Sequence, residues 1–214
     1  MSSVTGFYKT KCPHCGEEFD AECWAIARGD QDPEIKEFIL TGEFDMLRCP
    51  KCETFFRHEE PFLYYDEDKE FMAIVMPEEY ADDKASWLKK IKSQYDPLRE
   101  ALDFTKNISS EAYYFFGIDN LREILKTDQD RDEETEVISF MAEEEGFELR
   151  RIKPGTVREK DIPAVLPLPK GESSRESAIR AASTLYGKNE ALGRLKKLIE
   201  LLKSENGTEI NILK

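Results

Sequence analysis

The cysteines are the residues of this sequence best suited to chemistry, and four of them form two Cys-Pro-x-Cys pairs, Cys12 with Cys15 and Cys49 with Cys52. The thiolates of one such pair occupy one edge of a metal ion's coordination tetrahedron, and a second pair supplies the opposite edge. This pattern predicts one zinc ion bound by Cys12, Cys15, Cys49 and Cys52. Because four protein ligands leave no position open for water, the site is expected to be structural and not catalytic.

The first pair also allows a redox interpretation, because Cys-Pro-His-Cys occurs in strongly oxidising thioredoxin-fold proteins. In those proteins the first thiolate lies at a helix N-terminus. Here Gly16 follows Cys15 directly and residues 19–27 have the pattern of a strand. The second pair has no role in that chemistry either, so a thiol–disulfide oxidoreductase is the less favoured alternative.

Other candidate ligands are weaker. His14 lies between two cysteines of one turn, and His58 is expected on a strand surface. Cys23 alternates with apolar residues and is expected to be a small buried hydrophobe, with exchange into the metal site as the lesser alternative. Four thiolates around a divalent ion carry excess negative charge, which flanking cations can offset: Lys9, Lys11, Arg48 and Lys51.

The elements that must position these cysteines predict an α+β fold. Asp32-Pro33-Glu34 begins a helix, with Asp32 as its N-cap, and Gly42 ends it. Alternating apolar residues predict strands near 54–57, 62–65 and 71–75, with a polar turn at 66–69. We therefore expect residues 1–80 to form a zinc-ribbon-like domain, a small antiparallel sheet with one inserted helix.

Several of these motifs together resemble the CpXC domain family of bacteria and archaea. They are the two Cys-Pro-x-Cys pairs, Asp32-Pro33-Glu34-Ile35-Lys36, Tyr64-Tyr65-Asp66 and Phe71-Met72. The resemblance is specific over about the first third of the chain. It implies that Cys12, Cys15, Cys49 and Cys52 correspond to the cysteines through which that family is thought to bind metal. The family has no established activity, so the resemblance supports the site and does not indicate a task.

Helical patterns dominate the remainder of the sequence. Residues 81–152 are predicted to be a mainly helical region that packs on the first domain. Within it, the acidic run at 128–136 is expected to be a solvated connector, because it lacks the glycine and closing glutamate of a calcium loop. Residues 153–171 contain four prolines and are predicted to be an extended, non-helical linker.

The last segment, residues 172–214, is predicted to be a C-terminal helical hairpin with a tail. Ser173-Ser174-Arg175-Glu176 has the pattern of a capping box at its start. Residues 170–204 contain eight Lys or Arg against four Asp or Glu, in a chain whose net charge is −14. We expect these helices to dock on the acidic body of the chain, on a second copy, or on a protein partner. The tail at 209–213 can add an edge strand or act as a recognition peptide.

Composition limits the class of protein. The 214-residue chain has a net charge of −14, which opposes binding to nucleic acid or to an anionic membrane surface. No segment reaches the roughly 18 consecutive apolar residues of a membrane-spanning helix, and the first ten residues lack the apolar core of a signal peptide. We therefore expect a cytoplasmic protein, in which reduced thiols favour metal binding over disulfides.

These observations favour a non-catalytic zinc-binding protein that presents a surface to another protein, in an adaptor or regulatory role. We expect no enzyme, because no zinc-protease, serine-hydrolase, phosphate-loop or dinucleotide motif occurs. The alternative is a nucleic-acid- or transcription-associated zinc ribbon. In that case exposed aromatic side chains would stack on bases, the candidates being Phe55, Phe56, Tyr64, Tyr65 and Phe71.

Overall fold

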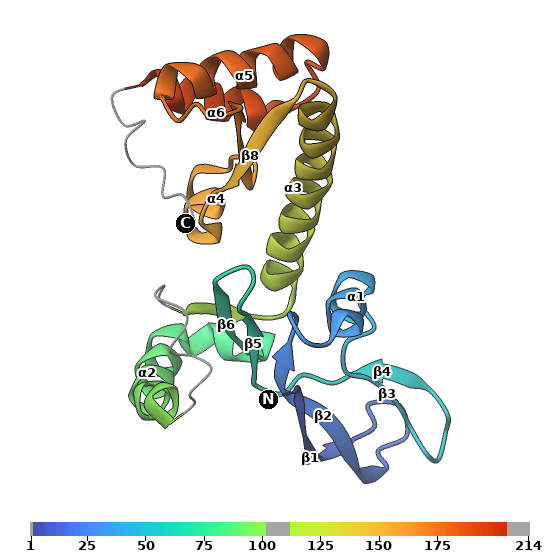
Figure 1. The fold of residues 1–214 in the computed structure, drawn as a ribbon. Coiled ribbons are helices and arrows are strands. Elements are labelled where there is room, and N and C mark those ends of the chain that lie inside the picture. Colours follow the sequence, from blue (N-terminus) through green and yellow to red (C-terminus); the bar gives the residue numbers. More distant parts are fainter. Residues whose placement is uncertain (1, 102–111, 205–214) are drawn as a thin grey trace. The chain divides into compact units, whose positions relative to one another are not determined.

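The computed structural model describes residues 2–101 and 112–204 (Figure 1). Backbone contacts divide the chain into two units, residues 1–125 and 126–214. Both units contain helices and strands, so the predicted α+β class is confirmed. The division falls at residue 125 and not at 80 or 152. None of the described helices is long and apolar enough to cross a membrane.

A five-stranded sheet organises the first unit. Its strand order is β1-β2-β5-β6-β7. The strands are β1 (Val4–Lys11), β2 (Glu18–Arg28), β5 (Phe62–Asp66), β6 (Phe71–Met76) and β7 (Tyr113–Phe116). The pairs β1–β2 and β5–β6 are antiparallel hairpins, whereas β2–β5 and β6–β7 are parallel. The expectation of a purely antiparallel sheet is therefore wrong, because both parallel pairs are joined by long connections that carry helices.

The remaining elements of this unit lie in those connections. Between β2 and β5 the chain forms helix α1 (Pro33–Thr41) and a separate two-stranded hairpin, β3 (Met46–Arg48) with β4 (Phe55–Arg57). Between β6 and β7 it forms the 3₁₀ helix η1 (Glu78–Asp83) and helix α2 (Lys84–Ala101). Strand β7 comes from residues 81–152, which were predicted to be a mainly helical region packing on the first domain, and it completes the sheet of the first unit.

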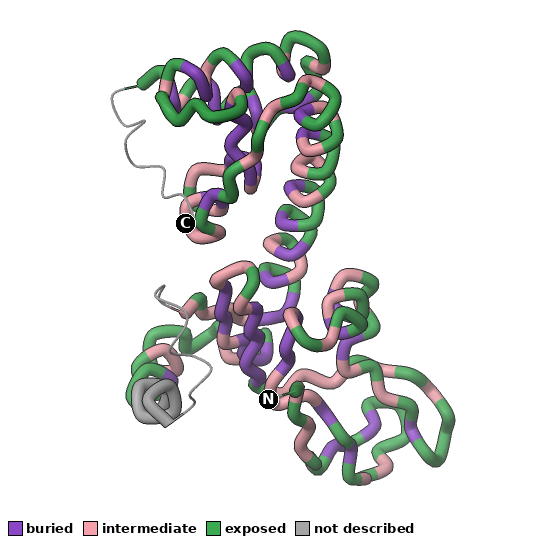
Figure 2. The backbone as a smooth tube through the Cα atoms, viewed as in Figure 1, coloured by how far each residue is buried: buried purple, intermediate pink, exposed green. Residues whose placement is uncertain are grey.

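The central strands β5 and β6 are buried on both sides, as Figure 2 shows. Successive side chains of a strand point to opposite faces. Tyr64 accordingly packs with α1 and the start of α3 (Asp119–Glu144), while Leu63 and Tyr65 pack toward Ile91 of α2. Continuous burial of this kind is expected for strands that have a helix layer on each face.

Helix α1 begins and ends close to the predicted positions. Pro33 is its first residue, where its missing N–H costs no hydrogen bond, and Gly42 ends it in the left-handed conformation at φ 85°. The prediction of Asp32 as a side-chain N-cap is wrong. Its carboxylate instead accepts a hydrogen bond from the backbone N–H of Ser3, at 3.1 Å, and so holds the N-terminus of the chain.

The second unit consists of most of α3 together with a small sheet and three further helices. These elements are β8 (Phe147–Arg151), α4 (Pro154–Lys160), β9 (Val165–Pro169), α5 (Arg175–Lys188) and α6 (Gly193–Lys203). The acidic run at 128–136 lies inside the continuous helix α3, so the predicted connector is wrong. Asp128 and Arg131 of that run are buried and form an ion pair.

The predicted extended linker at 153–171 is also wrong, for a physical reason. Pro154 is the first residue of α4, a position that suits proline because its N–H would have no partner there. Pro167 and Pro169 lie in β9, which pairs only with β8 in a two-stranded sheet. Both strands are edge strands. A proline is tolerated there where the N–H that it lacks would face away from the paired strand.

The C-terminal helices are present as predicted, with a shift of one residue at the first cap. Ser174, and not Ser173, is the N-cap of α5, and its hydroxyl accepts from the N–H of Ser177 at 3.1 Å. The apolar faces of both helices point into the core of the second unit, with Leu185 and Leu198 fully buried. The predicted tail segment at 209–213 lies outside the described residues.

Candidate metal centre

The two cysteine pairs occupy equivalent places in two β-hairpins of the first unit. Cys12 and Cys15 lie in the turn between β1 and β2, and Cys49 and Cys52 lie in the turn between β3 and β4. Each strand pair is held by its own ladder, with Lys11 opposite Glu18 in one hairpin and Arg48 opposite Phe55 in the other.

The two turns have the same hydrogen-bond pattern. In the first, the N–H of Gly16 donates to the carbonyl of Cys12 at 3.0 Å, and the N–H of Cys12 donates to Glu17 at 2.8 Å. In the second, Glu53 donates to Cys49 at 2.9 Å and Cys49 donates to Thr54 at 3.0 Å.

A left-handed residue closes each turn. It is Gly16 at φ 72° in the first and Glu53 at φ 60° in the second. Only glycine adopts this conformation without steric cost, so the second turn carries more backbone strain.

The structure brings the four sulfur atoms together. All four lie within 4.8 Å of one another. The distance is 3.7 Å from Cys12 Sγ to Cys52 Sγ and 3.6 Å from Cys15 Sγ to Cys49 Sγ. A disulfide bond is about 2.05 Å long, and all five cysteines of the chain are free thiols. This group of four sulfurs can therefore hold one metal ion, and it is the only such group among the described residues.

The cluster is buried on one side and open on the other. Cys12 and Cys49 are buried, whereas Cys15 and Cys52 are exposed. The hydroxyl and N–H of Thr54 lower the pKa of Cys52 to about 6. For Cys15, a backbone N–H lowers the pKa, but desolvation and the neighbouring thiols outweigh it and raise the pKa to about 12. Without metal, the four sulfurs thus do not all ionise at neutral pH.

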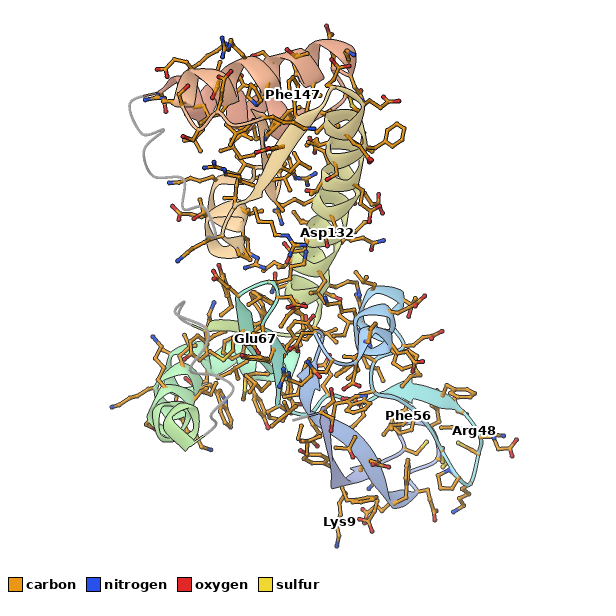
Figure 3. All side chains as sticks on the ribbon, in the orientation of Figure 1. Lys9, Arg48, Phe56, Glu67, Asp132 and Phe147 are labelled. Carbon is orange, nitrogen blue, oxygen red and sulfur yellow. The ribbon has the colours of Figure 1, made fainter. Side chains whose placement is uncertain are left out.

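Contacts beyond the cysteines join the two hairpins. The rings of Phe19 and Phe56 meet edge to face, with centroids 6.3 Å apart. The hydroxyl of Thr10 lies 3.2 Å from His58 Nδ1. Figure 3 shows Phe56 on the side of its hairpin that faces β2, and Arg48 on the opposite side.

The flanking cations pair with carboxylates as well as lying near the sulfurs. Lys51 Nζ is 2.8 Å from Glu17, and Arg48 is 3.1 Å from Glu53. Glu17 raises the pKa of Lys51, and the thiolate charges of the first and second turns add to that effect. Because all four partners are at least partly exposed to solvent, these pairs contribute little to stability.

The weaker candidates lie apart from the cluster. His58 Nε2 is 3.0 Å from Glu60, so its ring is engaged by Thr10 and Glu60 and not by sulfur. Cys23 is buried, as predicted, and burial raises its pKa to about 12. Cys12 follows strand β1 and no helix begins at either cysteine of its turn, so the geometry that activates an oxidoreductase thiol is missing from this part of the chain.

Comparison with family models places the chain in a family. Residues 10–144, more than half of the chain, match the family described as CpXC protein. The chain belongs to the CpXC family. The segment that matches the CpXC family begins two residues before Cys12 and ends at the last residue of α3, so it contains both cysteine turns. No curated protein and no solved structure matches the chain.

Most of the aromatic residues proposed to stack on bases cannot reach them. Tyr64, Tyr65 and Phe71 are fully buried in the core of the first unit. Phe56 packs against Phe19, which leaves Phe55, with 63% of its surface exposed. The aromatic surface assumed for a nucleic-acid-binding ribbon is therefore absent from β5 and β6.

Sequence reasoning missed one exposed face. The outer side of the β3–β4 hairpin carries Met46, Arg48, Phe55 and Arg57, all exposed, while Leu47 and Phe56 point to the inner side. We call these four residues the hairpin face. Met46 is paired with Arg57 and Arg48 with Phe55, so the four side chains form one patch. The alternation in Met46–Arg48 and Phe55–Arg57 is the signal that could have predicted it.

Asp45, at the start of the second hairpin, was also missed. Its carboxylate accepts a hydrogen bond from the N–H of Trp24 at 3.3 Å, and its carbonyl accepts from His58 at 3.2 Å. Burial raises the pKa of Asp45 to about 7, and the nearby carboxylate of Glu60 adds to the rise. A single acidic residue in a highly acidic sequence gives no pattern that could have identified it.

Proposed function

We propose that Cys12, Cys15, Cys49 and Cys52 hold one structural zinc ion, and that this CpXC protein acts by presenting the hairpin face to a protein partner. The positions of the four sulfur atoms support the zinc site. Zinc–sulfur bonds of about 2.3 Å in a tetrahedron require sulfurs about 3.8 Å apart. The distances of 3.7 and 3.6 Å across the two turns agree with that requirement.

A structural role follows from the ligand number and from the fold around the site. Four thiolates complete the coordination of zinc, so no water is left for activation. The β3–β4 hairpin has three residues in each strand, and an isolated hairpin of that size is marginal in water. It forms a sheet of its own and pairs with neither β1 nor β2. Zinc that links the two turns, contributing on the order of 10 kcal/mol, would hold this hairpin in place.

The composition of the hairpin face supports protein binding. Aromatic and arginine side chains dominate binding energy at protein interfaces. Phe55 and Met46 are 63% and 40% exposed, although each is large and apolar. Arg57 gives the face a positive charge in a chain with a net charge of −14, and Arg48 adds a second one that Glu53, 3.1 Å away, partly offsets. We infer a partner surface that is acidic around an apolar pocket.

The metal is tested by substitution and metal analysis. Cys49→Ser in the full chain is expected to lose the zinc and to unfold the β3–β4 hairpin. Cys23→Ser is the control, because Cys23 lies outside the sulfur group and should leave one zinc per chain. Zinc retained at one per chain in Cys49→Ser would contradict the ligand assignment.

The interaction surface is tested by crosslinking in the protein's own cells. Phe55→Ser is expected to abolish a crosslink that the unchanged chain forms at this face. Phe7→Ser is the matched control, because Phe7 is 79% exposed on β1, outside the hairpin face. Equal crosslinking by Phe55→Ser and the unchanged chain would contradict the proposal.

Self-association through the C-terminal helices is a second proposal. The apolar sides of α5 and α6 are used inside the second unit, so a second copy would contact their exposed cationic sides, which include Lys196 and Lys203. Light scattering on the full chain tests it. A dimer that becomes a monomer in Lys196→Glu/Lys203→Glu supports it, and a monomer before and after rejects it.

Two further expectations belong to this proposal. We propose a reducing compartment such as the cytoplasm, because a site of four reduced thiols is stable only where disulfides do not form. Binding to nucleic acid is not expected. A gel shift at low salt, where electrostatic attachment is strongest, would show a shifted band if that expectation is wrong.

A further inference from the structure

A hollow of about 390 Å³ lies between helix α2 and the sheet of the first unit. It is separate from the cysteine turns and opens to solvent. Three strands and the helix supply its lining: Ala25, Ile26, Pro61, Phe62, Leu63, Ile74, Met76, Trp87, Lys90 and Ile91. Its volume is within the range of small-molecule pockets, about 300–1,000 Å³.

Apolar side chains form nearly all of this lining. Ile26 and Ile74 are only half buried, although their chain neighbours Ala27 on β2 and Ala73 and Val75 on β6 are buried. Trp87 forms one wall, fixed by stacking on Tyr80 with ring centroids 4.1 Å apart and planes at 4°. A rigid aromatic wall beside uncovered sheet surface favours an apolar occupant.

Lys90 is the one charged residue of the lining. Its ammonium group lies 4.5 Å from the centre of the Trp87 ring. Within the described part of the chain, Lys90 forms no ion pair with a carboxylate. The described side chains of α2, up to residue 93, include four lysines and no acidic residue, in a chain with 45 acidic and 31 basic residues. Lys90 is therefore the charged group that the lining offers to a ligand.

We propose that the hollow binds a small amphipathic anion, an apolar chain or ring system that bears one carboxylate. The apolar part lies along Ile26 and Ile74, and the carboxylate pairs with Lys90 at the rim. A charge-assisted hydrogen bond of this kind is stronger than a neutral one and sets the orientation of the ligand. The proposal does not depend on the zinc site, because none of the four cysteines lines the hollow.

Decanoate is a suitable probe, with decan-1-ol as its neutral counterpart. Titration calorimetry on the full chain is expected to show one saturable decanoate site, with binding to decan-1-ol about two- to fivefold weaker. Fluorescence gives a second readout. Trp24 and Trp87 are the only tryptophans, so in Trp24→Phe the emission comes from Trp87 alone and should change on binding.

Three variants test the placement. Lys90→Gln is expected to weaken decanoate binding by about two- to fivefold and to remove its preference over decan-1-ol, because Lys90 is exposed and an exposed ion pair contributes only modestly. Ile26→Trp, at a side chain that packs on the α2 side of the sheet, fills the hollow and should abolish binding of both probes. Lys89→Gln is the control, because Lys89 is exposed on the same helix and outside the lining.

Some results would overturn the proposal. They are the absence of saturable heat with decanoate up to about 1 mM in the unchanged chain, or equal affinities in Lys90→Gln and Lys89→Gln, or full binding by Ile26→Trp. Zinc content measured on the same samples keeps the two proposals apart, because loss of binding with one zinc retained rejects only this one.

Discussion

Removal of the buried carboxylate of Asp128 should destabilise the second unit strongly. Asp128 is 6% exposed and receives hydrogen bonds from Arg131 and, at 2.9 Å, from Arg158. The side chains of these arginines are 5% and 14% exposed. Asp128→Asn leaves both guanidinium groups in a mostly dry environment without their shared counter-charge.

The expected loss is about 3 kcal/mol of unfolding free energy, at the lower end of the about 3–5 kcal/mol measured when one partner of a buried pair is removed. The lower end applies because Arg131 also lies 3.4 Å from Asp161 and keeps part of its pairing. A domain of this size has a total unfolding free energy of about 5–15 kcal/mol, so the second unit of the variant should unfold at a much lower urea concentration.

Hydrogen exchange resolves where the loss occurs. Amides of α4, α5 and α6 should exchange about 100-fold faster in Asp128→Asn, because 1.4 kcal/mol corresponds to a factor of ten. Amides of β5 and β6 in the first unit should be unchanged. Asp130→Asn is the control, since Asp130 is exposed on the same helix. Equal exchange in the two variants would refute the reasoning.

Other predictions concern single positions. Asp45 has a folded pKa of about 7, above its unfolded value of about 3.9, so its protonated form favours folding and stability falls as pH rises from about 4 through 7. Asp45→Asn should remove this loss of stability, and asparagine tolerates the φ of 50° at this position. The loss is roughly 2 kcal/mol of unfolding free energy between pH 5 and 8, reduced because the side chain keeps some contact with solvent. If urea melts of Asp45→Asn show the same pH profile as the unchanged chain, the prediction is wrong. Gly29→Ala should destabilise the first unit by about 1–3 kcal/mol, because the added Cβ would lie 2.0 Å from the hydroxyl of buried Tyr64. Gly187→Ala, in open space near the end of α5, should stabilise by up to about 1 kcal/mol; melting curves that rank these two variants in the opposite order would contradict both.

Local patterns of the sequence predicted the local structure well. The cysteine pairs were expected in turns, with strands following them near 19–27 and 54–57, and Pro33 with Gly42 predicted the limits of α1. Strands β1 and β3, which precede the turns and complete the hairpins, were not predicted. These signals involve residues a few positions apart, where backbone preference decides the conformation. The motifs indicated the CpXC family over about the first third of the chain, and the family model matches residues 10–144.

Long-range pairing could not be predicted in the same way. The parallel pairing of β2 with β5 joins Ile26 to Leu63, and no local pattern specifies it. The prolines of residues 153–171 were misinterpreted as signs of an extended linker. Pro154 fits because it begins a helix, and Pro167 and Pro169 fit because they lie on an edge strand, and neither setting can be read from the prolines alone. Asp128 was misinterpreted because its partner Arg158 lies 30 residues away in the sequence and allows this one carboxylate of the acidic run to be buried.

X-ray absorption at the zinc edge of the purified, reduced full chain tests the central claim most directly. The account predicts one zinc per chain with four sulfur neighbours at about 2.3 Å and no nitrogen or oxygen in that shell. A shell with fewer than four sulfurs, or a reduced chain that binds no zinc, would contradict it.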